Sequence, residues 1–323
     1  MKLARLLIAA AAVLSAAYAA HAEPKLIAIA NFGDHPALKS TVDGFKARMT
    51  ALGYVEGTDV TYDYQHVNFD RSLIPQLLQQ TEAKKPALIF TVTTGVTQAS
   101  IRGITDKAIP IVFGAVVDPV VAGIVPDWEH GSETHAGASM LPDFDASLAY
   151  LRQVLPDVKT VGTLFNPGED NDTTNIKLIN EAAAKAGVEI VAVPVDNAND
   201  LPQRVQSFSG KVDAIFLIQS NIVQTAVPVV AQVAQRIKLP LFNSVYSEEL
   251  KDQLAGFHAI SYVKNGEHVA DIADRILKGE KPAAIPTYVP QPEDFDSLVS
   301  PKGLEAVGLT LPEALKDSPW IIK

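Results

Sequence analysis

The chain has 323 residues and no cysteine, and 47% of its residues are hydrophobic and 20% charged. This is ordinary globular composition for about two domains, and the lack of cysteine excludes disulfides and thiolate chemistry. Acidic residues outnumber basic ones by 37 to 27, so we expect neither a nucleic acid nor an anionic membrane surface as a partner.

The N-terminus has the pattern of a cleaved signal peptide over residues 1–22. Lys2 and Arg5 precede an apolar run at residues 6–13, and an Ala-His-Ala sequence ends the segment before a new, more polar composition. The run is too short to span a bilayer, and no cysteine can carry a lipid anchor. We therefore expect residues 23–323 to be a soluble periplasmic protein without membrane insertion. A cytoplasmic repressor is excluded, because the signal peptide stands where a DNA-binding domain would be.

The first half of the mature chain alternates strand and helix patterns. An apolar stripe at helical spacing runs from Leu38 to Leu52 and stops at Gly53, and a second helix is expected near residues 72–82. Continuous apolar runs are typical of strands buried on both faces. They predict strands at residues 25–30, 60–64, 87–92 and 110–113.

The second half repeats this order with different residues, at a period of roughly 130 residues, which is the size of a lobe rather than of a solenoid repeat. A helix with Ile176, Ile179, Ala183 and Ala186 on one face ends at Gly187. Strands are predicted at residues 160–165, 188–193, 214–218 and 239–242.

Alternating strands and helices predict parallel sheets covered by helices, and the repeat predicts two such doubly wound lobes joined by a hinge. Ligands bind at the carboxyl ends of the strands in such sheets. The chain is expected to cross between lobes near residues 137–142, 257–262 and 284–292. We assign residues 23–137 and 263–283 to lobe 1, and residues 138–262 and 284–323 to lobe 2.

Motifs for nucleotide binding and covalent catalysis are missing from the sequence. It contains no Gly-x-Gly-x-x-Gly, no Walker loop and no Gly-x-Ser-x-Gly elbow. Only two histidines lie close together, His130 and His135, in what we interpret as a surface loop, and no third ligand for a metal is evident. We expect no enzyme activity, no metal and no cofactor.

Several short segments resemble the ABC transporter substrate-binding family that includes tryptophan and tyrosine receptors. They occur in the family's order and cover the chain from about Lys25 to Leu311. The segments are Asp34 to Leu38, Gly44-Phe45, Leu52 to Gly57, Val117 to Val120, Phe165 to Pro167, Leu277 to Gly279, Lys281 to Ala283, Ile285-Pro286 and Gly308-Leu309.

This resemblance implies a type I periplasmic-binding fold, a ligand held between two closing lobes, and docking to an ABC permease in the inner membrane. The chain departs from the family's pattern at two positions. Ser220 stands where the family has an acidic residue, which weakens the case for a ligand ammonium there, and Asp34 stands where the family often has Glu. The resemblance places binding residues around Asp34, His35, Thr94, Gln98, Asp118, Asn166, Ser220 and Asn221.

In lobe 1, Thr93, Thr94 and Gly95 end a buried strand where a helix begins, with Gln98 one turn later. Free N–H groups, hydroxyls and the positive end of the helix dipole suit a carboxylate there, although Thr94 could simply cap the helix. Asp118 could accept hydrogen bonds from a ligand or cap the helix that begins at Pro119. His35 could bind a ligand, orient Asp34 or be incidental.

In lobe 2, short polar side chains stand at corresponding strand ends. They could serve turns and caps, or form a neutral, hydrogen-bonding pocket wall. These residues are Asn166, Ser220, Asn221, Asn243 and Ser244.

Four aromatic residues lie near the strand-end loops: Phe32, Phe165, Tyr246 and Tyr262. Each could belong to the core, but together they permit an aromatic or apolar ligand, with Phe32 and Tyr246 as the candidate contacts. Arg71 is the only arginine near the loops, so a multiply charged anion is disfavoured and a monocarboxylate or zwitterion is favoured.

We therefore predict a monomeric solute-binding protein of an ABC uptake system. Its ligand is predicted to be an aromatic or apolar amino acid, or a related organic acid, that carries a carboxylate and is captured by hinge closure. The alternatives are a ligand-sensing periplasmic subunit of a membrane receptor and an exported enzyme on the same fold.

Overall fold

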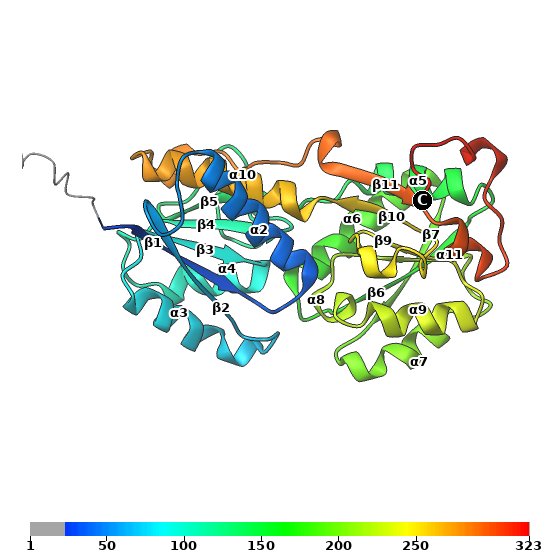
Figure 1. The fold of residues 1–323 in the computed structure, drawn as a ribbon. Coiled ribbons are helices and arrows are strands. Elements are labelled where there is room, and N and C mark those ends of the chain that lie inside the picture. Colours follow the sequence, from blue (N-terminus) through cyan, green and yellow to red (C-terminus); the bar gives the residue numbers. More distant parts are fainter. Residues whose placement is uncertain (1–22, 323) are drawn as a thin grey trace, which may run out of the picture.

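The computed structural model describes residues 23–322, which form two α/β lobes side by side (Figure 1). The predicted signal peptide, residues 1–22, lies outside the described residues. Within residues 23–322, no helix has both the length and the apolar character needed to cross a bilayer.

Lobe 1 contains a five-stranded parallel sheet in the order β2-β1-β3-β4-β5. Its elements are β1 (Lys25–Asn31), α2 (Pro36–Ala51), β2 (Val60–His66), α3 (Ile74–Ala83), β3 (Leu88–Val92), α4 (Thr94–Gly103), β4 (Ile111–Val116), β5 (His135–Ser139) and α10 (Tyr262–Leu277).

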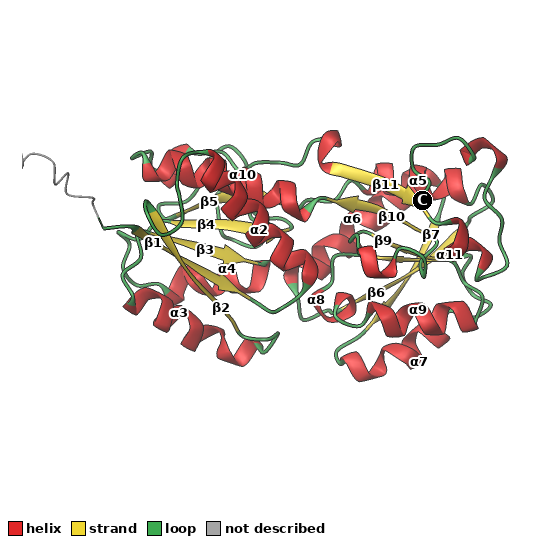
Figure 2. Ribbon diagram, viewed as in Figure 1, coloured by secondary structure: helices red, strands yellow, loops and turns green. Residues whose placement is uncertain are grey.

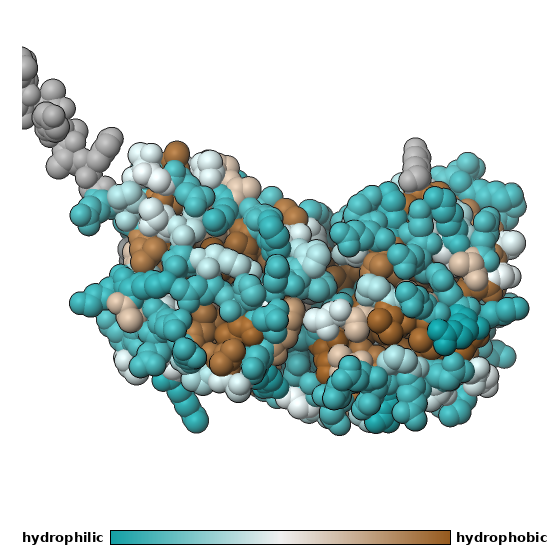
Figure 3. All heavy atoms as spheres, turned by 60° about the horizontal axis from the view of Figure 1, so that its bottom comes forward, coloured by the Kyte–Doolittle hydropathy of each residue, from teal (hydrophilic) through white to brown (hydrophobic). Residues whose placement is uncertain are grey.

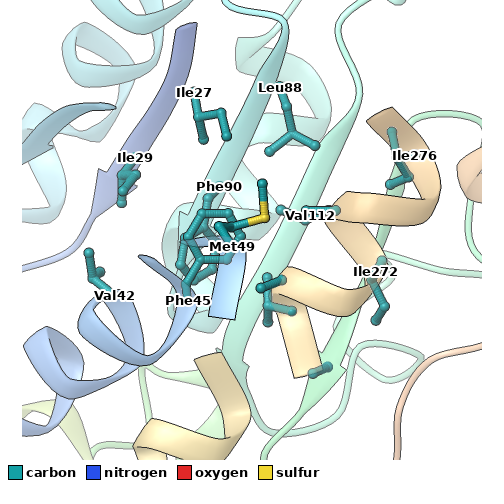
Figure 4. Packing of buried hydrophobic residues seen from close by; sticks show 14 of the residues in the cluster. Ile27, Ile29, Val42, Phe45, Met49, Leu88, Phe90, Val112, Ile272 and Ile276 are labelled. Atoms are coloured by element: carbon teal, nitrogen blue, oxygen red, sulfur yellow. The ribbon is translucent and has the colours of Figure 1, made fainter. Parts of the chain in front are cut away.

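Helices cover both faces of this sheet (Figure 2). Helices α2 and α10 pack on one face, where Phe45, Met49 and Phe90 are fully buried in the largest core cluster of the lobe (Figure 4). The rings of Phe45 and Phe90 lie 4.7 Å apart. Helices α3 and α4 cover the other face, where Leu78 and Val96 are buried. Burial on both faces explains why these strands appear in the sequence as continuous apolar runs.

Helices α2 and α10 lie in close contact because glycine occupies the contact points. A Cβ atom at Gly266 of α10 would lie 2.0 Å from the carbonyl oxygen of Thr41, and one at Gly44 of α2 would lie 2.3 Å from that of Val263. No other residue type leaves room for this approach. The contact fixes α10, which enters lobe 1 directly from the hinge, against the helix that follows β1.

Lobe 2 contains a six-stranded sheet in the order β11-β10-β9-β8-β6-β7, in which β11 runs antiparallel to β10. Its elements are α5 (Phe144–Val154), β6 (Thr160–Phe165), α6 (Asp170–Ala186), β7 (Glu189–Pro194), α7 (Leu201–Gln206), β8 (Ala214–Leu217), α8 (Asn221–Gln224), α9 (Val227–Arg236), β9 (Leu241–Asn243), β10 (Gly256–Ile260), β11 (Phe295–Val299) and α11 (Pro301–Glu305).

This sheet too is covered on both faces. Helices α5, α6 and α11 bury Phe216 and Phe242 on one face, and α7 and α9 bury Phe257 on the other. The two lobes therefore confirm the predicted doubly wound α/β fold, with the antiparallel edge strand β11 as an addition that the sequence pattern did not indicate.

Three chain segments join the lobes: residues 140–143, Ser261, and residues 289–294. The first and third lie later in the chain than the predicted boundaries. Ser139 still pairs within the lobe 1 sheet, and Tyr288 hydrogen-bonds beside it to Gly137 and Ser139. The second and third segments contact each other, since the amide of Ser261 donates to the carbonyl of Asp294 at 2.8 Å.

The prediction that His130 and His135 lie in a surface loop is wrong for His135. His130 is exposed and contacts Asp127 at 2.9 Å, but His135 begins β5 and is only 2% exposed. The sequence His-Ala-Gly-Ala-Ser of β5 has little apolar character, because this strand lies beneath α10, where small residues fit.

Candidate functional site

The carboxyl ends of the parallel strands of both sheets face each other across the junction of the lobes (Figure 1). Gln98 and Arg71 of lobe 1 bridge this cleft. The amide of Gln98 donates to Asp170 Oδ2 at 2.6 Å, and Arg71 Nη1 donates to the carbonyl of Gly168 at 2.8 Å. From outside, the lobes appear as two masses with a narrower waist between them and a mainly hydrophilic surface (Figure 3).

A small chamber of about 20 Å3 lies between the lobes, which is room for about one water. The chamber is lined from lobe 1 and the hinge by Leu38, Thr93, Thr94, Ala115, Val117, Met140 and Tyr262, and from lobe 2 by Asn171, Gln219 and Asn221.

Thr93 and Thr94 form the lobe 1 wall at the N-terminus of α4. Both are 3% exposed, and neither hydroxyl has a hydrogen-bond partner among the described residues. Thr93 has a φ of 84°, and Ala115, also in this wall, has a φ of 52°. Such backbone strain in non-glycine residues is common at ligand sites. A Cβ at the next residue, Gly95, would meet nothing within 4 Å.

The lobe 2 wall presents side-chain amides. Gln219 is 8% exposed, and neither its oxygen nor its nitrogen has a partner among the described residues. Asn171 donates to the carbonyl of Gln219 at 3.1 Å. The hydroxyl of Ser244, just after β9, is likewise buried without a partner in residues 23–322. Ser220, just after β8, is fully buried, with its side chain beside Asp172. Polar groups are thus concentrated where little water can reach them.

Two carboxylates stand behind these amides at the start of α6. Glu169 is 7% exposed and accepts from Asn221 Nδ2 at 2.6 Å and from Asn166 Nδ2 at 3.3 Å. Asp172 is fully buried. It accepts from the backbone N–H of Asn166 at 2.6 Å and from Asn171 Nδ2 at 2.7 Å. Burial, and secondly the charge of Glu169, raise the pKa of Asp172 to about 8.

A wider groove opens beside the chamber and shares Asn221 with it. Its lobe 1 wall consists of Phe32, Phe69 and Arg71, with the two rings packed edge to face at 5.4 Å. Its lobe 2 wall includes Glu169 and other polar residues around the loops after β6, β7 and β8. The groove therefore combines an aromatic wall with a polar, charged one.

A second groove lies between the N-terminus of α2, the hinge and the loop after β9. Tyr246 lines it, 40% exposed, with its ring 5.2 Å from that of Phe257 and its hydroxyl bonded to Glu248. Nearby, His35 Nδ1 accepts from the amide of Ala37 at 3.2 Å and so caps α2. Burial lowers the pKa of His35.

Other predicted site residues have local structural contacts. Asp118 Oδ1 accepts from the amides of Val120 and Val121, both at 2.9 Å, and so caps the turn after β4. Asn243 exchanges two hydrogen bonds with Gln224 inside lobe 2. Asp34 is exposed and lines neither the chamber nor the grooves.

The structure thus brings Thr93, Thr94, Asn166, Asn221 and Phe32 together around the chamber and its adjoining groove. Sequence reasoning overlooked four buried polar residues on the lobe 2 side of the cleft. All four lie within, or directly before, loops already recognised as strand ends, and a polar or acidic side chain at that position was the available signal. They are Glu169, Asn171, Asp172 and Gln219.

The chain is similar to known proteins in both sequence and fold. The model of the family described as ABC transporter substrate binding protein matches residues 26–321. A tyrosine-binding protein of Clostridioides difficile (strain R20291) is 27% identical over 262 residues, which is 81% of this chain and 75% of that protein.

Two solved structures extend the comparison. The ABC domain in complex with L-Trp from Streptococcus pneumonia is 25% identical, with a TM-score of 0.85 over 93% of this chain and 100% of that one. The ligand-free, open structure of CD0873 from Clostridium difficile, a substrate-binding protein with adhesive properties, is 28% identical, with a TM-score of 0.71 over 93% and 99%. The chain described here belongs to the ABC transporter substrate-binding protein family.

Proposed function

We propose that this protein is the periplasmic solute-binding component of an ABC uptake system and that it captures a small carboxylate-bearing ligand between its lobes. Family membership makes it a substrate-binding protein rather than an enzyme. The carboxylate is inferred from one observation, the first turn of α4 with the buried, unpartnered hydroxyls of Thr93 and Thr94.

The chemistry of that turn suits an anion. The first N–H groups of a helix have no partner within the helix, and the helix dipole places partial positive charge there. Neither Thr93 nor Thr94 caps these groups with its side chain. A ligand carboxylate between the lobes would accept from both the N–H groups and the hydroxyls, and it would satisfy groups that are costly to bury alone.

The adjoining groove suits the rest of an aromatic or apolar amino acid, or of a related organic acid. Its edge-to-face pair Phe32 and Phe69 offers an apolar wall. Arg71 is its only cationic residue, which disfavours phosphates and dicarboxylates because these require paired cations. The names of the similar proteins, one tyrosine-binding and one bound to L-Trp, point to the same ligand class.

The arrangement of the lobes supports capture by closure. The structure of this chain superimposes better on the L-Trp complex than on the ligand-free, open relative, with TM-scores of 0.85 and 0.71. The two bridges across the cleft stabilise the same closed arrangement. The N-terminal segment, with its signal-peptide pattern, supports export to the periplasm, where the closed form would dock to an inner-membrane permease.

A thermal shift screen of amino acids and organic acids tests the proposal. A ligand at about 100 times its Kd should raise Tm by about 5 °C. Thr94→Val removes the hydroxyl with little change of shape and should weaken binding about tenfold. The control is Thr58→Val, on an exposed turn of lobe 1. If no amino acid or organic acid shifts Tm, the proposed ligand class is wrong.

A further inference from the structure

We infer that Glu169 is the ammonium-binding group of the cleft, so that the ligand is a zwitterionic α-amino acid rather than a simple carboxylic acid. This inference rests on the proposed function, because it assumes a ligand carboxylate at α4. It concerns the group that would lie on the other side of the ligand's α-carbon.

Glu169 is a buried carboxylate that forms no ion pair within residues 23–322. Its oxygens accept only from the neutral amides of Asn166 and Asn221. Buried charges are normally paired with an opposite charge, since amide hydrogen bonds recover only part of the lost hydration. The site therefore favours a cation supplied from outside the chain.

The surroundings of Glu169 increase this preference. Asp196 lines the same groove. The only cationic side chain of the groove is Arg71, and its Nη1 is bonded to the carbonyl of Gly168. The groove thus contains more carboxylates than cations, and the local potential attracts a positive group.

A separate observation shows that the adjoining chamber is built for a polar ligand. The amide of Gln219 lines it, is more than nine-tenths buried and has no partner at either end within the described residues. The hydroxyls of Thr93 and Thr94 line the opposite wall and are also buried without a hydrogen-bond partner among the described residues. Unpartnered donors and acceptors on both walls need hydrogen-bonding groups between them.

Asn221 connects the two sites. It lines the chamber with Thr93 and Thr94, and its amide donates to Glu169 at 2.6 Å. Glu169 is therefore one side chain away from the chamber. The carboxylate and ammonium of an α-amino acid are separated by a single carbon, so the proposed ligand has its carboxylate at the α4 turn and its ammonium on the side of Asn221, toward Glu169. This arrangement supplies the acidic group that Ser220 lacks, from the loop after β6 instead of the loop after β8.

The test compares amino acids with their deaminated analogues. Binding of L-Tyr, L-Trp, L-Phe and L-Leu and of the corresponding 3-arylpropionates and 4-methylpentanoate is measured by calorimetry with the wild-type protein and with Glu169→Gln. We expect the wild type to bind an amino acid at least tenfold more tightly than its analogue. Glu169→Gln should weaken amino-acid binding about 10-fold to 100-fold, because a hydrogen-bonded charge pair is lost, and should change Kd of the analogue less than about threefold.

Glu181→Gln is the matched control, because it removes the same charge from the exposed face of the same helix. Its Kd values should equal those of the wild type. If Glu169→Gln fails to fold, the wild-type preference for the amino acid still decides the question. Equal binding of amino acid and analogue by the wild type, or equal weakening of both by Glu169→Gln, overturns the inference but leaves the carboxylate proposal standing. Absence of binding by either class refutes the proposed function itself.

Discussion

The side-chain amide of Gln98, on α4 of lobe 1, donates a 2.6 Å hydrogen bond to the carboxylate of Asp170, in the first turn of α6 of lobe 2. The same amide also donates to the carbonyl of Ala122 at 3.1 Å. Gln98 therefore connects α4 of lobe 1 to α6 of lobe 2 across the cleft. It lies one turn from the proposed carboxylate site and is in a position to couple ligand binding at α4 to closure of the lobes.

Replacing Gln98 with Glu should shift the protein toward the open form. A carboxylate at position 98 would repel Asp170 instead of donating a hydrogen bond to it. Because Asp170 is exposed, we expect a loss of only about 1 kcal/mol in binding free energy, which is about a fivefold rise in Kd. Small-angle X-ray scattering should show a larger radius of gyration at subsaturating ligand. Gln235→Glu is the control, since Gln235 bonds only within lobe 2. Unchanged scattering and Kd would show that this bridge contributes nothing to closure.

The strands and the main helix of lobe 1 could be predicted because their sequence pattern is set by burial alone. β1 and β3 are covered on both faces, which requires continuous apolar runs, and α2 has one buried face. β5 could not be predicted in this way. Its small residues are selected by the close passage of α10, a contact between segments more than 120 residues apart.

The candidate site was predictable only in part, and for a similar reason. Strand ends are visible in a sequence, so Thr93, Thr94 and Asn221 could be placed in the cleft from their position alone. Whether a strand-end side chain faces the cleft or its own lobe depends on tertiary contacts. Asn243 has the expected position but pairs with Gln224, whereas Glu169, in a loop of ordinary polar composition, is buried in the cleft wall.

Gly266→Ala should destabilise lobe 1 strongly. Its new Cβ would lie 2.0 Å from the carbonyl oxygen of Thr41, so α2 and α10 must move apart, at a cost of about 3 kcal/mol or more. Urea unfolding measures the loss. Glu267→Ala, one residue along the same helix, is the comparison and should change stability by less than about 1 kcal/mol. Equal stability of Gly266→Ala and the wild type would refute the close approach of the two helices.

His135 should make the protein less stable in mild acid. Burial lowers its pKa to about 4, and its ring contacts Ser100 Oγ at 2.9 Å and Thr134 Oγ1 at 2.8 Å. The unfolded chain binds a proton near pH 6.5, whereas the folded one does so only near pH 4. Stability is therefore retained above pH 6.5 and lost as the pH falls toward 4, by about 3 kcal/mol in total.

His135→Gln should remove this loss, although it also costs stability at pH 7.5 because a packed ring is replaced. The measurement is the free energy of unfolding in urea at several pH values between 4 and 7.5, taken as the difference between variant and wild type. A slope that survives in His135→Gln would assign the acid sensitivity to another group.

Asp172 should have the opposite pH dependence. Its pKa is raised to about 8 in the folded protein by burial and by Glu169, against about 4 in the unfolded chain. Between these two pKa values the folded state holds a proton that the unfolded state has released. The contribution of Asp172 to the free energy of unfolding is therefore complete below pH 4. It declines as the pH rises to 8, by at most about 1.4 kcal/mol per pH unit. Asp172→Asn should abolish that decline, so its stability relative to the wild type should rise from pH 5 to pH 8.

Urea unfolding of both proteins across this range measures the difference, which also cancels the contribution of His135. Asp145→Asn, at an exposed acid on α5, serves as the control for loss of one negative charge. A relative stability of Asp172→Asn that does not change between pH 5 and 8 would mean that Asp172 is already ionised at pH 5. The two N–H donors on its oxygens would then outweigh burial, and Asp172 would add a full negative charge to the cleft wall, which would strengthen its preference for a cationic group.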